Sequence, residues 1–172
     1  MRSVFIFLRD TSEAEVATYL DRAYPAQWEP WLVNSAGDPC LYVNFYRDAS
    51  REFDSEDWSD LVQRFGGEPA VVVMADVSGR HPGDEQVFDF VTDLLSRFSG
   101  SAQDDYTEHL WSLDELRAGF QVLGHPFFDY IGWHAQSQAD WGWPRLLANR
   151  GGAAARGDGR PHRDRSSLRD PG

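Results

Sequence analysis

Lysine is absent from this chain, so all 16 basic residues are arginines. Acidic residues outnumber them, and the formal net charge is −12. The charge is uneven, because residues 1–144 hold 25 Asp and Glu against 9 Arg, while residues 145–172 hold 7 Arg against 3 Asp. An acidic body repels nucleic acids and anionic lipids and attracts basic surfaces. We therefore expect a basic protein as the partner, and neither nucleic acid nor membrane.

Cysteine and long apolar runs are also scarce. Cys40 is the single cysteine, so no internal disulfide can form, which is consistent with a reducing compartment. The apolar run over residues 4–8 ends at Arg9 and is too short for the core of a signal peptide. No run approaches the roughly 20 apolar residues that span a bilayer. These observations predict a cytoplasmic protein.

Established signatures of catalysis are missing as well. The glycines form neither a GxGxxG dinucleotide fingerprint nor a GxxxxGK phosphate-binding loop. No GxSxG nucleophile elbow occurs, and the His and Cys spacing fits no zinc signature. We therefore expect no cofactor, no bound metal and no catalytic residue.

The residues that are present suffice for one folded domain. The chain has 172 residues, of which 41% are hydrophobic, and a chain of this size can bury about two-thirds of its unfolded surface. Beyond about residue 147 the apolar residues give way to Gly, Ala, Arg, Asp and Pro. Such a composition cannot offset the entropy of ordering the chain. We predict a globular domain over residues 1–147 and a disordered tail over residues 148–172.

Hydrophobic periodicity predicts alternating strands and helices. Ser12 and Ser112 each begin a capping box, in which the Ser side chain caps a helix and a Glu three residues later reaches back. Two further helices are predicted from apolar residues at helical spacing, over residues 55–65 and 84–98. Buried or half-buried apolar patterns predict strands over residues 4–8, 31–33, 41–45, 70–77 and 101–104.

This alternation is typical of an α/β fold. We predict a mixed sheet of about four to five strands with helices packed against it, either a ferredoxin-like two-layer sandwich or a small three-layer sandwich. The helix over residues 55–65 lies between two strands, which favours a right-handed parallel crossover. Residues 127–133 form either a final strand or a packed aromatic segment.

The densest group of polar and aromatic side chains follows the last predicted short strand. Loops on a rigid scaffold are where binding residues gather, aromatic side chains supply binding energy and carboxylates attract basic partners. The alternative is an acidic loop whose Asp side chains cap turns. We interpret the segment as a protein-binding surface made of Asp104, Asp105, Tyr106, Glu108, His109 and Trp111.

A second polar segment, residues 76–83, lies where a strand ends and a helix begins. Ligands bind at the carboxyl ends of strands in α/β sheets, which points to a pocket lined by Asp76, Ser78, Arg80 and His81. The alternative is a simple strand-to-helix turn. If the two strands are neighbours, the carboxylates of Asp76 and Asp104 meet, and a metal-assisted hydrolase using Asp76, Asp104, Asp105 and His109 is a second hypothesis.

In this small, acidic chain with seven Trp, residues 72–80 and 104–115 resemble bacterial proteins of the polymorphic-toxin immunity type. The resemblance covers about residues 1–135 and carries no motif specific to one family. It implies a non-enzymatic inhibitor that blocks the active site of a toxin. Our first hypothesis is therefore a cytoplasmic protein that neutralises a basic toxin through an acidic, aromatic surface. The metal-assisted hydrolase and a regulatory domain without an active site remain open.

Overall fold

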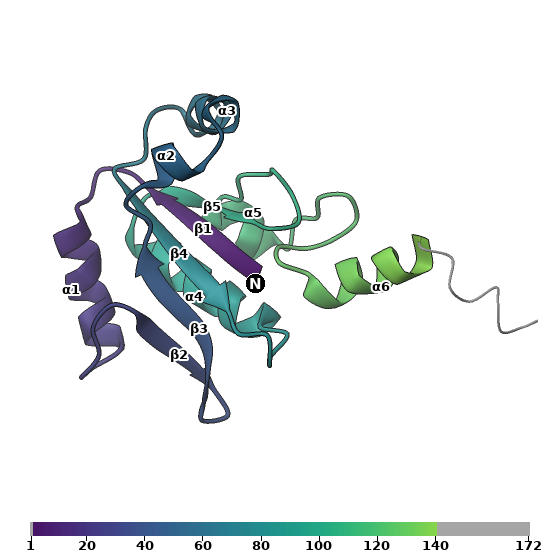
Figure 1. The fold of residues 1–172 in the computed structure, drawn as a ribbon, viewed down its shortest axis with the longest axis horizontal. Helices are drawn as coiled ribbons and strands as arrows, with labels where there is room; N and C mark the ends of the chain where they lie inside the picture. The colour runs from purple at the N-terminus through teal and green to yellow at the C-terminus, as the bar shows by residue number, and fades with distance from the viewer. Residues whose placement is uncertain (1, 141–172) are drawn as a thin grey trace, which may run out of the picture.

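The computed structural model of the chain describes residues 2–140 (Figure 1). The tail predicted over residues 148–172, and with it the predicted domain boundary, lies outside the described residues. The strands are β1 (Arg2–Leu8), β2 (Trp31–Ser35), β3 (Asp38–Phe45), β4 (Val71–Val77) and β5 (Gly100–Asp104). The helices are α1 (Glu13–Ala23), α2 (Ala49–Glu52), α3 (Ser55–Phe65), α4 (Asp84–Arg97), α5 (Leu113–Ala118) and α6 (Tyr130–Asp140).

The five strands form one sheet in the order β2-β3-β4-β1-β5, and every neighbouring pair is antiparallel. The predicted α/β class, with helices packed against a sheet of about four to five strands, is confirmed, but the sheet is antiparallel throughout and not mixed as predicted. Strands β3, β4, β1 and β5, with α1 and α4 on one face, have the ferredoxin-like arrangement, which β2 extends at one edge.

The predicted parallel crossover between β3 and β4 is wrong. The two strands are antiparallel neighbours, with Phe45 at the end of β3 opposite Val73 near the start of β4. The connection contains the short helix α2, which was not predicted, and then α3. Together they return the chain to the end of the sheet that it left, whereas a crossover helix would carry it to the opposite end.

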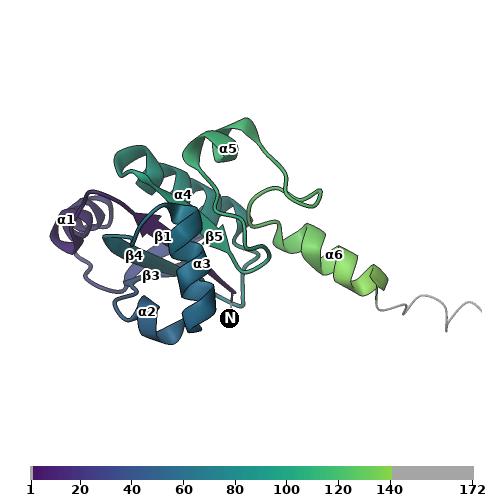
Figure 2. The same ribbon diagram turned by 90° about the horizontal axis from the view of Figure 1, so that it is seen from above.

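The core follows from the alternation of side chains along β1. Val4, Ile6 and Leu8 face α1 and α4, whereas Phe7 faces α2 and α3. Figure 2 shows α1 and α4 on one side of the sheet and α2 and α3 on the other. Each fully buried aliphatic or aromatic side chain contributes about 1.5–3 kcal/mol relative to an exposed one, so the two faces hold the helices in place.

Helices α2 and α3 cover only part of their face of the sheet. Their core includes Phe7 and Val72, at the end of the sheet near the loop to α1. Toward the other end of the same face lie Tyr42, Met74 and Asp76, which are partly exposed, and neither Tyr42 nor Met74 packs against either core. This open end of the sheet face lies beside the loop that follows β5.

The aromatic segment after α5 is packed rather than extended. Phe127 and Phe128 are buried in the core, and the next residues begin α6, so the alternative of a final strand is wrong. Tyr130 and Trp133 are three residues apart, which places them on one side of a helix. The Arg2 guanidinium lies 4.0 Å from the centre of the Tyr130 ring, and the rest of α6 projects away from the body (Figure 1). None of the helices between residues 2 and 140 is both long enough and apolar enough to cross a bilayer.

Candidate functional site

Asp104 is a structural residue of the loop after β5. Its side chain is 5% exposed, and its Oδ1 accepts hydrogen bonds from the N–H groups of Tyr106 (3.2 Å) and Thr107 (2.9 Å) and from the Thr107 hydroxyl (3.1 Å). Its Oδ2 accepts the N–H of Phe128 at 3.0 Å. Both oxygens are therefore used to fix the loop against the aromatic segment, and Asp104 cannot contact a partner, contrary to its predicted place in a binding surface.

Trp111 is also buried, with 1% of its surface exposed. The chain folds back along β5, and Trp111 exchanges two backbone hydrogen bonds with Ala102 (2.9 and 2.7 Å). Its ring packs edge-on against Phe127, with 5.6 Å between ring centres. The predicted contact of Trp111 with a partner is therefore wrong, because backbone pairing at the sheet edge draws the ring into the core.

Tyr106 and His109 are half-buried. The Tyr106 ring lies 5.5 Å from Phe128 and stacks at 6.0 Å on Trp133, and burial raises the pKa of its hydroxyl to about 12. His109 lies 3.1 Å from a carboxylate oxygen of Glu115 and touches the edge of Trp111. Of the six residues predicted for the surface, only Asp105 and Glu108 are exposed.

Glu108 lies beside α3. The Arg64 guanidinium donates to the backbone carbonyl of Glu108 and, at 2.8 Å, to the Asp60 carboxylate. Asp57, Asp60 and Glu108 line a small hollow between the loop and the helix. With the exposed side chain of Glu56, these carboxylates form what we call the acidic ridge: Glu56, Asp57, Asp60 and Glu108.

Asp105 and Asp76 both accept hydrogen bonds from Ser3. The Ser3 hydroxyl donates to Asp76 at 2.7 Å, and the Ser3 N–H donates to Asp105 at 2.5 Å. Partial burial of the carboxylate raises the pKa of Asp105, the N–H of Ser3 lowers it, and the charges of Asp104 and Asp76 add to the increase. Two carboxylates, one on β4 and one in the loop after β5, therefore accept hydrogen bonds from one serine at the open end of the sheet face.

The condition under which Asp76 and Asp104 would meet, that their strands are neighbours, is not fulfilled. Strand β1 separates β4 from β5, and Asp76 pairs with Ser3 while Asp104 pairs with Val4. Adjacent residues of a strand point to opposite faces, so the two carboxylates lie on opposite sides of the sheet. The sequence did place Asp76 and Asp104 at the same end of the sheet, but it gave no signal that another strand lies between them.

A hollow of about 470 Å³ lies next to Asp76. It is lined by Tyr42, Asp76, Val77, Ser78 and Gly79. Asp76 and Ser78 thus line a pocket, as the sequence predicted, but Arg80 and His81 are not among its lining residues. Tyr42 was not predicted; its only signal was its alternation with buried residues of the same strand.

The four residues of the hydrolase hypothesis do not come together. Asp104 faces away from Asp76, and His109 pairs with Glu115. Within residues 2–140, no group of three or more His, Cys, Asp or Glu side chains is arranged to hold a metal ion. The part of the chain that the structure describes therefore has no assembled metal centre on which a hydrolytic step can be based.

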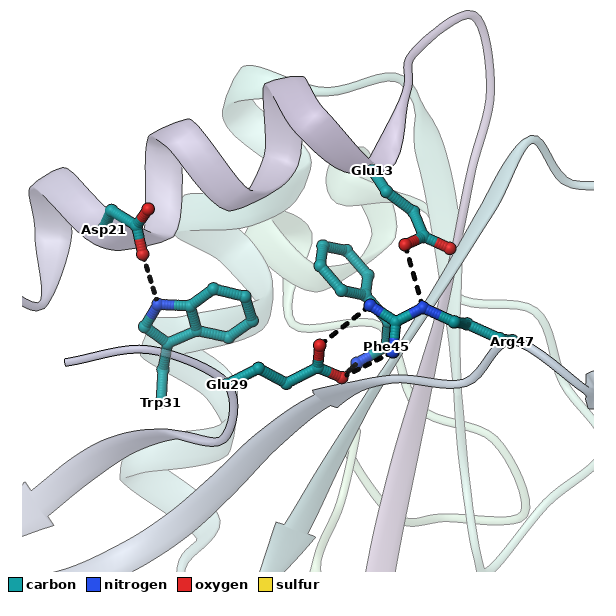
Figure 3. A network of polar contacts seen from close by, with 6 residues as sticks. All are labelled: Glu13, Asp21, Glu29, Trp31, Phe45 and Arg47. Atoms are coloured by element: carbon teal, nitrogen blue, oxygen red, sulfur yellow. Dashed lines mark hydrogen bonds and ion pairs between the residues drawn. The ribbon is translucent and has the colours of Figure 1, made fainter.

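A second polar network lies at the opposite side of the sheet (Figure 3). Arg47 donates to Glu13 at 2.9 Å and to both carboxylate oxygens of Glu29, at 3.1 and 2.8 Å, while Trp31 donates its indole N–H to Asp21 at 2.9 Å. Arg47 forms ion pairs with two carboxylates, and its pair with Glu13 connects α1 to the strands. We interpret this network as structural, since each of its charged side chains already has a hydrogen-bond partner within the chain.

The chain matches no protein-family model, no curated protein and no solved structure. Its function therefore has to follow from the carboxylates, the hollow and the fold that positions them.

Proposed function

We propose that the chain is a non-enzymatic, cytoplasmic binding protein that neutralises a basic protein, as immunity proteins do with toxins. The observation that carries this proposal is the acidic ridge, which has four exposed carboxylates on α3 and the loop after β5, of which Arg64 pairs with that of Asp60. The α/β scaffold holds them on a helix and on a loop that Asp104 fixes in place.

The charge of the ridge is largely uncompensated. Arg64 pairs with Asp60, and within residues 2–140 no ion pair engages Glu56, Asp57 or Glu108. Carboxylates held close together on a rigid surface create a negative potential that speeds the association of a basic partner. An acidic surface can also take the place of the phosphates that a basic nuclease binds, so a basic nuclease is one class of toxin that fits this proposal.

Two half-buried aromatic residues in the same loop as Glu108 suit the same role. Tyr106 and His109 remain partly exposed, and in the sequence they follow Asp105 and Glu108 directly. Aromatic side chains at the centre of an interface contribute much of its binding energy, whereas exposed charges mainly set the association rate. We assign the binding surface to the acidic ridge together with Asp105, Tyr106 and His109.

The test is the binding of the full chain to the purified product of the gene next to its own. Surface plasmon resonance at 50 and 200 mM NaCl separates association from dissociation. The double variant Asp57→Asn/Glu108→Gln should slow association about tenfold at low salt and change dissociation little, because exposed charges act mainly by steering. The control is Asp114→Asn, which removes one exposed charge from α5.

Two outcomes count against the proposal. One is the absence of any complex between the two proteins. The other is a complex whose association rate responds neither to salt nor to the double variant, since such a complex would not depend on the acidic ridge.

A further inference from the structure

We propose that the hollow beside Asp76 is a guanidinium-binding pocket that takes an arginine side chain of the basic partner; this inference rests on the proposed function. The hollow, of about 470 Å³, lies within the range of roughly 300–1,000 Å³ that is typical of ligand pockets. It occupies the open end of the same sheet face that carries α3 and the acidic ridge.

The walls of the hollow suit a planar cation. Tyr42 on β3 lies directly opposite Asp76 on β4 in the register of the sheet, so the two side chains stand side by side on one face. A guanidinium can stack on an aromatic ring while it donates hydrogen bonds to a carboxylate, which a compact ammonium does less well. The pairing of ring and carboxylate therefore favours arginine.

The Asp76 carboxylate has an oxygen available for such a ligand. Oδ1 accepts the Ser3 hydroxyl at 2.7 Å, and Oδ2 has no hydrogen-bond partner among residues 2–140. No described arginine forms an ion pair with Asp76. A hydrogen bond between ionised groups is about twice as strong as a neutral one, so this oxygen is the natural anchor for a guanidinium.

Asp105 strengthens the preference for a cation. Its carboxylate and that of Asp76 accept hydrogen bonds from the same residue, Ser3, so a second negative charge lies near the carboxylate that lines the hollow. A bound cation relieves their mutual repulsion. Gly79 leaves the space open, because a Cβ added there would meet nothing within 4 Å.

The test uses the full chain and N-acetyl-arginine amide as the probe, followed by two-dimensional amide NMR. The neutral control ligand is N-acetyl-citrulline amide, which keeps the shape of arginine and lacks its charge. The arginine probe should shift the amides of Tyr42, Val77, Ser78 and Gly79, with a Kd on the order of 1 mM for so small a ligand. The citrulline probe should shift them at least tenfold less at equal concentration.

Three variants identify the pocket. Asp76→Asn should weaken binding of the arginine probe at least tenfold, because it removes the anchoring charge and keeps the shape. Gly79→Val should do the same by occupying part of the hollow without removing any charged group, so the pocket is still tested if Asp76→Asn disturbs Ser3. Asp114→Asn, the matched control, should bind as the natural chain does.

Several results would overturn the proposal. They are equal binding of the two probes, equal weakening by Asp114→Asn, and shifts that spread over the acidic ridge instead of the hollow. A further arm replaces the seven arginines of residues 145–172 with Gln. If that change alone moves the amides of Tyr42 and Ser78 and tightens probe binding, the chain's own arginines fill the hollow and the assignment to a partner is wrong.

The outcome is separable from that of the proposed function. Probe binding at the hollow, without a complex with the neighbouring gene product, would support the guanidinium pocket and contradict the immunity function. A tight complex whose affinity Asp76→Asn and Gly79→Val leave unchanged would support the immunity function and contradict the pocket.

Discussion

Asp104 and Asp105 are adjacent in the sequence, yet their side chains serve different purposes. Asp104 turns inward and accepts four hydrogen bonds that hold the loop after β5 to the aromatic segment. Asp105 turns outward, is exposed and accepts the N–H of Ser3. A strand sends neighbouring side chains to opposite faces, so Asp104 stabilises the fold while Asp105 stays at the surface, where our proposal assigns it to binding.

Substitution of Asp104 should destabilise the fold. Asp104→Asn replaces one accepting oxygen with a donor, so either the Phe128 N–H or the donors of Thr107 lose their partner. An unsatisfied buried polar group costs about 1–3 kcal/mol, and we expect a loss of that size in the free energy of unfolding measured with urea. Asp105→Asn is the control and should not destabilise the chain. Equal losses in the two variants would show that Asp104 is not a structural residue.

Asp105 should make stability depend on pH. Because its pKa is raised in the folded chain above the ordinary 3.8, the folded chain binds its proton more tightly than the unfolded chain does. The stability that this provides is present below pH 3.8 and is lost as pH rises through the folded pKa. Asp105→Asn should therefore stabilise the chain at pH 7, by less than about 1 kcal/mol because the group is exposed, and not at pH 3. Urea unfolding at both values checks this; a gain at pH 3 alone would contradict it.

For the helices and strands, patterns within a few residues were sufficient to predict the structure. Features that depend on distant parts of the chain could not be predicted. Both capping boxes form as predicted, because the Ser and Glu of each box lie three residues apart and need no other part of the chain. The direction of β4 relative to β3 depends on the path of the connection through α2 and α3. Hydrophobic periodicity does not predict that path. In the candidate site, Asp76, Ser78, Asp105 and Glu108 could be predicted from their places after strands. Ser3 and Tyr42 could not, since only the register brings them to Asp76.

Strand β5 needs a glycine at its first residue. A Cβ on Gly100 would lie far inside van der Waals contact of the Phe7 carbonyl oxygen, which belongs to the neighbouring strand β1. Gly100→Ala should therefore lower the free energy of unfolding by at least ~2 kcal/mol, as overpacked sites do. Gly79→Ala is the matched control, because the space around Gly79 is open, and it should leave stability nearly unchanged. Equal effects of the two substitutions on the free energy of unfolding would show that the backbone of β1 can move away from a Cβ at residue 100 at little cost.

Helix α6 should be held more firmly at low pH. His125 lies between Asp129, 2.8 Å from Nδ1, and Gln136, 2.6 Å from Nε2, and its ring stacks on Trp133. The hydrogen bond to Asp129, followed by that to Gln136, raises the pKa of His125, because only the doubly protonated ring donates to both. This contribution is complete below pH 6.5 and is lost as pH rises through the folded pKa.

The protection of α6 amides from hydrogen exchange should therefore fall between pH 6 and pH 8. His125→Gln should remove the dependence, and Ile131→Ala, at a side chain that is 63% exposed, should leave it intact. Protection that stays constant over this range in the natural chain would show that His125 does not hold the helix.

For the molecule as a whole, the dominant property is an excess of negative charge with few cations to offset it. The ion pair of Arg51 with Asp48 is largely exposed, and that of Arg64 with Asp60 is partly exposed; surface pairs of this kind contribute about 0–1 kcal/mol. The repulsion among the remaining carboxylates opposes folding, and the negative potential that they create would attract a basic partner of the kind we propose. Such a binding surface would lower the stability of the free chain, as functional surfaces commonly do.

Salt should then act in opposite directions on the free chain and on its complex. Raising NaCl from 10 to 300 mM screens the repulsion and should raise the melting temperature of the free chain by ~2–4 °C, the shift that about 1 kcal/mol produces at this size. The same change should weaken the complex with the basic partner, because it screens the attraction across the interface. Calorimetric melting of the free chain and binding isotherms at the two salt concentrations measure both effects. A free chain that melts lower in salt would mean that attractive ion pairs outweigh the repulsion. In that case the carboxylates would already be matched within the chain, and the acidic ridge would have no excess charge with which to attract a partner.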